Sequence, residues 1–214
     1  FGTANPERMD VPFWRAMVAC GQTAYDARTH FGEGGLDAEP VWCFDRFGTS
    51  FTELPDGRVI EIGGEHEDHY DPDFCIDNDV VVNDGGGGFA IYGYSKDVFL
   101  STDFHTVTLV GRSILIVGGL GYKGERKYGT TPLYRLDTGT LAVEPVATAG
   151  EAPGWISRHR ATREGSRLTI AGGKVCGWAD GRETYEDNAG VFVLDLETMT
   201  WEKVNSSATS TGAE

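Results

Sequence analysis

Apolar residues recur at three- and four-residue steps near the start of the chain and predict an amphipathic helix over Val11 to His30. Asp10 is placed to act as the N-cap, and Pro12 falls in the first turn, where its missing N–H costs nothing. The stripe is formed by Trp14, Met17, Val18, Gly21, Ala24 and Tyr25. We expect it to dock on the rest of the protein, and we assign residues 1–39 to this helix and a linker.

From residue 40 the pattern changes to short β-rich runs that are broken by Gly, Asp and Pro. Residues 54–64, 109–119 and 162–173 each predict a strand, a tight glycine turn and a second strand that ends in a glycine pair. The glycine pairs begin at positions 63, 118 and 172, so the unit repeats every 54 or 55 residues. A repeat of this length is typical of arrays and propellers.

A third and a fourth strand are predicted after each glycine pair. The third strands lie in residues 79–84, 132–137 and 190–195, and each ends in or next to an Asp whose carboxylate can bond backbone N–H groups in the following turn. Four strands per unit is the arithmetic of a propeller blade. The sequence therefore predicts an all-β protein with three four-stranded blades, over about 40–99, 100–153 and 154–204, and a polar tail over 205–214.

The glycine pair after an apolar strand, the Tyr134-x-x-Asp137 and Phe192-x-x-Asp195 steps and the aromatic Trp201 resemble the kelch repeat. This resemblance implies a kelch-type β-propeller. Because closed propellers normally have four to eight blades, three blades would form an incomplete propeller. We expect that another chain completes it, or that the chain is part of a longer protein or a larger complex; the remaining alternative is an open arc sealed by the N-terminal helix.

Charge narrows the range of partners. The chain has 18 basic and 33 acidic residues among 214, a formal net charge of −15, so we expect no nucleic-acid partner. No apolar run approaches the roughly 20 residues that span a bilayer, so we expect no membrane insertion. No C-x-x-C pair occurs among Cys20, Cys43, Cys75 and Cys176, which favours free thiols and a cytoplasmic location but leaves the disulfide state open.

The segment 65–79, expected to be a loop, is rich in acidic residues and contains two histidines. Glu67, Asp68 and Asp71 are candidate residues of an acidic binding rim, and Asp71 with His66 and His69 is a candidate ligand set for a divalent cation. Some kelch proteins that act on small molecules bind a ferrous ion through Glu, Asp and His at four-residue spacing. Here Glu67 and Asp71 fit that series, but Cys75 stands in place of the His. We expect no cofactor, with a divalent cation as the alternative.

The corresponding loops of the next two repeats differ in character. Lys123, Arg126 and Lys127 make the second loop basic. The third, residues 174–188, carries aromatic and cationic residues of the kind that anchor protein interfaces, namely Trp178, Arg182 and Tyr185. The acidic and basic loops should be neighbours, which allows either an intramolecular ion-pair contact or a bipolar rim that binds a protein.

Ser50, His105 and His159 align by eye at the start of the innermost strands, which line the channel of a propeller. Asp103 could orient His105, and Arg158 and Arg160 flank His159. Such groups could bind an anion or transfer a proton. The alternative is that the histidines belong to the scaffold and bond to neighbouring backbone.

The sequence shows no nucleophile elbow and no P-loop. The leading hypothesis is therefore a non-catalytic module that binds another protein or associates with itself. The alternative is a metal-dependent enzyme or ligand-binding protein that uses segment 65–79 and the channel histidines.

Overall fold

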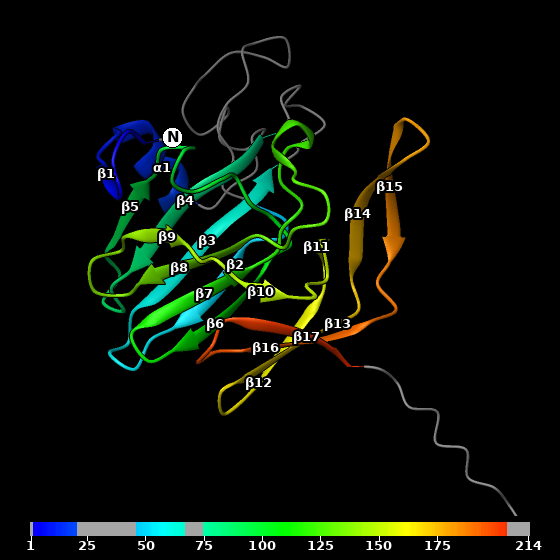
Figure 1. Ribbon diagram of the computed structural model, residues 1–214. Helices are drawn as coiled ribbons and strands as arrows, with labels where there is room; N and C mark the ends of the chain where they lie inside the picture. Colours follow the sequence, from blue (N-terminus) through cyan, green and yellow to red (C-terminus); the bar gives the residue numbers. More distant parts are fainter. Residues whose placement is uncertain (1, 21–45, 67–74, 205–214) are drawn as a thin grey trace, which may run out of the picture.

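The computed structural model describes residues 2–20, 46–66 and 75–204. These residues form an all-β protein in which four small sheets have a β-propeller arrangement (Figure 1). The sequence predicted three blades, whereas these residues form four sheets; the strands of the three predicted repeats lie in three of them. Residues 21–45, 67–74 and 205–214 lie outside the described residues, and with them the predicted linker, the polar tail and the second half of the predicted helix.

The first sheet has the strand order β1-β5-β4-β3-β2, with antiparallel pairing throughout. Its strands are β1 (Glu7–Met9), β2 (Ser50–Glu53), β3 (Val59–His66), β4 (Cys75–Asn83) and β5 (Phe89–Gly93). β3 runs on past its glycine pair to His66, and β4 begins at Cys75. Residues 75–79, which we expected in a loop, are therefore strand residues, and Asp77, Asn78 and Asp79 are buried.

The second and third sheets each contain four antiparallel strands, and in the third sheet β10 adds to β17 in parallel. The second sheet has the order β6-β7-β8-β9, and the third has the order β10-β17-β16-β13-β12. The strands of the second are β6 (Thr106–Val110), β7 (Ser113–Val117), β8 (Leu133–Asp137) and β9 (Val143–Pro145), with a 3₁₀ turn η1 (Lys123–Glu125) between β7 and β8. The strands of the third are β10 (Ala149–Gly150), β12 (Arg160–Glu164), β13 (Arg167–Ala171), β16 (Val191–Asp195) and β17 (Thr200–Val204).

The fourth sheet is formed by β11 (Trp155–Ser157), β14 (Lys174–Ala179) and β15 (Arg182–Asp187), in the order β11-β14-β15. We expected residues 174–188 to be a loop, and this expectation is wrong. Most side chains of β14 and β15 are at least partly exposed, so the hairpin lacks the apolar alternation that reveals a strand. Its turn, Asp180-Gly181, has two positive φ angles of 52° and 73°, as two-residue hairpin turns require.

Apolar side chains fill the spaces between successive sheets. Ile60, Ile62 and Val80 of the first sheet share one core with Ile114 and Ile116 of the second. A second core joins residues of the second and third sheets with Ile156 of the fourth, and is formed by Leu115, Val117, Leu133, Ile156, Leu168, Ile170, Phe192, Leu194 and Trp201. The second sheet therefore contributes alternate residues of β7 to two different cores, because successive side chains point to opposite faces.

Helix α1 (Pro12–Cys20) covers the outer face of the first sheet. Trp14 is buried against Val81 and Ile91, which confirms that this end of the apolar stripe docks on the sheet. β1 was not predicted, because three residues give no pattern. Within the described ranges no helix is long and apolar enough to cross a membrane.

The glycine pairs allow successive sheets to approach closely. Gly63 and Gly118 have φ angles of 55° and 71°. A Cβ added to Gly63 would lie 2.3 Å from the carbonyl oxygen of Thr102, just before the second sheet, and one added to Gly118 would lie 2.3 Å from that of Ile156, in β11 of the fourth sheet. Gly172 occupies the corresponding position of the third repeat with a φ of 66°, but a Cβ there would meet nothing within 4 Å. Among the described residues, none covers the third sheet at Gly172, whereas the first two sheets are covered at the equivalent glycines.

This difference gives a matched pair of variants. Gly118→Ala and Gly172→Ala introduce the same strain of about 1–2 kcal/mol, because both φ angles are left-handed. Only Gly118→Ala also pushes a methyl group against the Ile156 carbonyl. We expect urea denaturation to show a loss of unfolding free energy that is larger for Gly118→Ala by about 1–3 kcal/mol. Equal losses in the two variants would contradict the packing described here.

Candidate functional sites

Strand register shows which channel positions are equivalent in the three repeats. Ser50 pairs with Ile62, Thr106 with Val117 and Arg160 with Ala171, each time with the residue just before a glycine pair. Ser50, Thr106 and Arg160 are therefore equivalent. The alignment of Ser50 with His105 and His159 is off by one residue, because it was made by eye without the register of the second strand.

The two histidines join successive sheets. Ser50 Oγ of the first sheet lies 2.7 Å from His105 Nε2, and Thr106 Oγ1 of the second sheet lies 2.8 Å from His159 Nε2. The other ring nitrogen of His105 lies 3.3 Å from Thr102 Oγ1. Each histidine thus reaches back to the hydroxyl group that begins the preceding repeat, and the contact is repeated along the array.

Burial makes both imidazoles weak bases. Burial, with a smaller contribution from His159, lowers the pKa of His105 from 6.5 to about 3. Burial alone lowers the pKa of His159 from 6.5 to about 4. Both rings are therefore neutral near pH 7, and their geometry supports the scaffold interpretation over proton transfer.

The charged residues that flank the histidines are directed elsewhere. Asp103 accepts a hydrogen bond of 2.7 Å from the Gly121 N–H, whereas the contact of His105 Nδ1 is with Thr102. Burial raises the pKa of Asp103, and the Gly121 N–H opposes the rise. The guanidinium carbon of Arg158 lies 3.3 Å from the ring centre of Phe104, and both Arg158 and Arg160 are exposed.

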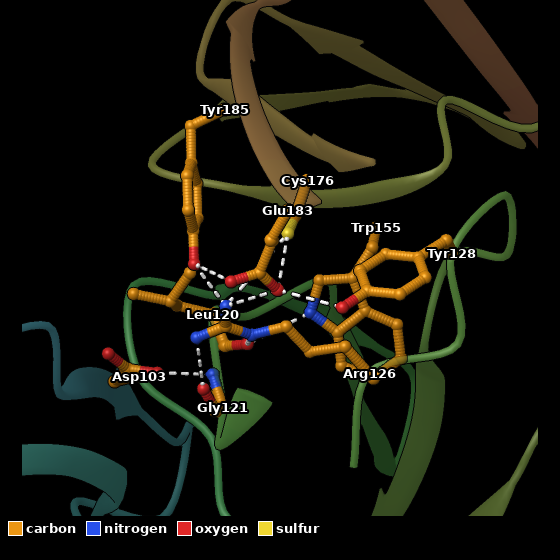
Figure 2. Close-up of polar contacts among 9 residues, drawn as sticks. All are labelled: Asp103, Leu120, Gly121, Arg126, Tyr128, Trp155, Cys176, Glu183 and Tyr185. Atoms are coloured by element: carbon orange, nitrogen blue, oxygen red, sulfur yellow. Dashed lines mark hydrogen bonds and ion pairs between the residues drawn. The ribbon is translucent and has the colours of Figure 1, made fainter. Parts of the chain in front are cut away.

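Arg126 lies at the centre of a buried polar network between the loop that follows β7 and the β14–β15 hairpin (Figure 2). Its Nη1 is 2.8 Å from Glu183 Oε1, and both side chains are more than nine-tenths buried. Arg126 also donates hydrogen bonds to the carbonyl groups of Leu120 and Gly121, at 2.9 and 2.7 Å. Such a pair is stable only when the remaining donors and acceptors are also satisfied.

The other contacts of this network satisfy Glu183. The hydroxyls of Tyr185 and Tyr128 donate to its two oxygens at 2.7 and 3.0 Å, and the Cys176 thiol donates at 3.1 Å. Burial favours the neutral acid, but the four donors around the carboxylate outweigh it and hold the pKa of Glu183 at about 2. Burial and the hydrogen bond to Glu183 raise the pKa of Tyr185 to about 12.

Several predicted rim residues meet here. Arg126 and Tyr185 are in direct contact, and the Trp178 ring lies 5.8 Å from that of Tyr128. Trp178 and Tyr185 remain about half exposed, and Lys123, Lys127 and Arg182 are exposed around them. The acidic rim residues and one proposed ligand fall outside the described residues: Glu67, Asp68, His69 and Asp71.

The pairing of Glu183 with Arg126 was not predicted from the sequence. The sequence signal for this pair is the two-residue spacing of side chains along the hairpin strands. Cys176 lies opposite Tyr185, and Trp178 lies opposite Glu183. These residues share one face of the hairpin because side chains two apart point the same way. Without the strand assignment that face could not be recognised.

A second buried group of charges lies in the first sheet. Arg46 Nε is 3.2 Å from Asp77 Oδ2, and Arg46 Nη1 and Nη2 are 2.5 and 3.1 Å from the two oxygens of Asp79. His66 Nδ1 is 3.5 Å from Asp77 Oδ2. Burial raises the pKa of the Cys75 thiol to about 11, and the nearby Asp77 charge adds to the rise. Cys75 and Cys176 are free thiols.

No protein family matches this chain, and no curated protein matches it either. The class of protein is therefore defined by the fold alone, as an all-β chain with a β-propeller arrangement of small sheets.

The channel histidines predict a specific pH dependence. Their folded pKa values of about 3 and 4 lie below the ordinary value of 6.5, so the unfolded chain binds more protons between about pH 6.5 and pH 4. Their contribution to stability is complete above about pH 6.5 and is lost as the pH falls through this window. We expect the melting temperature to fall between about pH 7 and pH 5, and to fall less in His159→Gln. An equal decrease in the variant would contradict the assignment.

Proposed function

We propose that this chain is a non-catalytic protein-binding module of the kelch type, in which a β-sheet of another polypeptide packs on the third sheet and extends the propeller. The observation that carries the proposal is the open surroundings of Gly172, set against the closely covered Gly63 and Gly118. A repeated contact surface that ends without a neighbour is a natural site for association.

The side chains on that open face support the same interpretation. Arg160 is equivalent to Ser50 and Thr106 in the first two repeats. Ser50 contacts His105 and Thr106 contacts His159, whereas Arg160 is exposed. Ala171, Val191 and Val204 lie in the same cross-strand row. Val191 and Val204 are 37% and 43% exposed, so an apolar strip crosses the sheet. A partner that covers this strip gains by removing it from water.

The outer face of the first sheet differs, because α1 packs on it through Trp14. Stacking a second copy head to tail would need that face. We therefore infer that the partner supplies its own sheet, whether it is a different protein or a second copy that meets the open face through its own third sheet.

The rim around the β14–β15 hairpin offers a second contact area. Trp178 and Tyr185 are large and about half exposed. Tyr185 bonds to the Arg126–Glu183 pair and Trp178 lies against the Tyr128 ring, which limits the entropy lost on binding. Lys127 and Arg182 beside them favour an acidic segment on the partner.

The kelch assignment rests on the sequence resemblance together with the left-handed glycine pairs and the Asp-closed turns. The enzyme alternative loses one of its supports, because His105 and His159 are neutral and bonded between sheets.

The test places a photo-crosslinking amino acid at Thr169 in the open face, with Thr140 in an exposed turn of the second sheet as the matched control. In cell extract, the probe at position 169 should give one defined adduct that the probe at 140 does not give. Val191→Lys should reduce this adduct by about tenfold, because it places a charge in the apolar strip.

Light scattering completes the test. Self-association through the open face would give a mass above 23.2 kDa that Val191→Lys abolishes and Val11→Lys, at an exposed residue beside α1, leaves unchanged. A well-folded monomer of 23.2 kDa without a specific adduct at position 169 would overturn the proposal.

A further inference from the structure

The ends of β3 and β4 bring three different metal-binding side chains together. His66 and Cys75 lie directly opposite each other in the antiparallel pair, and Asp77 follows Cys75 two residues later, on the same face of β4. One ligand atom from each residue lies within 4.8 Å of the other two. This placement follows from strand register and so does not depend on residues outside the described ranges.

The three donor atoms indicate which ion would fit. Imidazole nitrogen, thiolate sulfur and carboxylate oxygen are the ligands of Zn²⁺, whereas Ca²⁺ and Mg²⁺ prefer oxygen alone. Three protein ligands leave a fourth tetrahedral position for water or another donor. His66 and Asp77 are buried, and Cys75 is the partly exposed member of the group.

The charges around the group favour a cation. Arg46 forms ion pairs with two fully buried carboxylates, Asp77 and Asp79, so these three described side chains carry one more acidic group than basic group. A divalent cation and the thiolate that it stabilises add one net positive charge, which balances this excess. Burying an uncompensated charge is costly, so such a balance stabilises the fold.

Arg46 also orients one ligand. Its Nε lies 3.2 Å from Asp77 Oδ2, while Oδ1 of the same carboxylate lies 3.9 Å from Cys75 Sγ. Metal-binding carboxylates are commonly held in this way by a second polar partner.

We propose that His66, Cys75 and Asp77 bind one zinc-class divalent cation, the Cys75 thiol releasing its proton to solvent as the metal–sulfur bond forms. The site lies at the end of the β3–β4 pair, and the described residues supply three of its four ligands. It shares only Cys75 with the four-residue series Glu67, Asp71 and Cys75. The inference is independent of the proposed protein-binding function, because it concerns the first sheet and not the open face of the third.

Co²⁺ is the probe, because a cobalt–thiolate bond gives an intense near-ultraviolet charge-transfer band. Chelator-treated protein titrated with Co²⁺ should develop this band and saturate at one ion per chain, and Zn²⁺ should displace it. Cys75→Ser should lose the band, whereas the matched control Cys176→Ser, which removes the other described free thiol, should keep it. His66→Gln should weaken Zn²⁺ binding by at least about tenfold.

Alkylation of the wild-type protein provides a readout that needs no variant to fold. Zn²⁺ should protect Cys75 from iodoacetamide, as read by mass spectrometry of the digested chain, and should leave the labelling of Cys176 unchanged. The proposal is overturned by the absence of a charge-transfer band in the wild type, by a band of equal strength in Cys75→Ser, or by a lack of protection at Cys75.

Discussion

Close backbone approach between successive sheets is the constraint on which the rest of the structure depends. Gly64 and Gly119 donate hydrogen bonds of 2.8 and 2.9 Å to the carbonyls of Thr102 and Ile156. A second series runs along the channel, where the N–H of Phe104 bonds the Gly48 carbonyl and the N–H of Arg158 bonds the Phe104 carbonyl, both at 2.8 Å. Polar backbone groups in such a core must be paired, so these bonds fix the spacing at which the apolar cores form.

The channel series explains an unusual backbone feature. Gly48, Phe104 and Arg158 occupy equivalent positions and all have positive φ angles, of 65°, 50° and 58°. A left-handed conformation costs a residue with a side chain about 1–2 kcal/mol. Because each of these corners takes part in a bond to the neighbouring repeat, the strain is compensated by contact between sheets. His105 and His159 directly follow Phe104 and Arg158. The left-handed backbone there brings the two imidazole rings within hydrogen-bond distance of the Ser50 and Thr106 hydroxyls.

The parts of the repeat that could be predicted from the sequence are those where a single residue type fixes the backbone conformation. The glycine pairs need left-handed φ angles, and the Asp residues accept turn N–H bonds, as Asp137 does from Gly139 and Thr140 and Asp195 does from Glu197 and Thr198. These requirements are local, so the sequence shows them directly.

The features that sequence reasoning missed depend on contacts between distant segments. The β14–β15 hairpin has little apolar alternation and is held by β11 and by the Arg126–Glu183 pair, which joins residues 57 positions apart. In the same way, Asp77 and Asp79 looked like members of a solvated loop because four acidic residues, at positions 67, 68, 71 and 73, precede them along the chain. In the structure they are buried by their pairing with β3 and by Arg46.

The structure contains two groups of buried charges, and each lies beside one of the proposed binding sites. The Arg126–Glu183 pair supports the aromatic rim, and the Arg46 group orients Asp77 beside His66 and Cys75. Each would be costly if it were broken, since a lone buried charge is destabilising by several kcal/mol. Buried ion pairs thus hold both the aromatic rim and the proposed metal ligands in position.

Native-state hydrogen exchange of the Phe104 and Arg158 amides tests most directly whether bonds between sheets hold the array together. We expect both amides to exchange only through global unfolding, with the same free energy as the Ile116 amide inside β7. Exchange faster than that of Ile116 by about a hundredfold or more, through local opening, would show that the sheets are joined by side-chain packing alone and would contradict this claim.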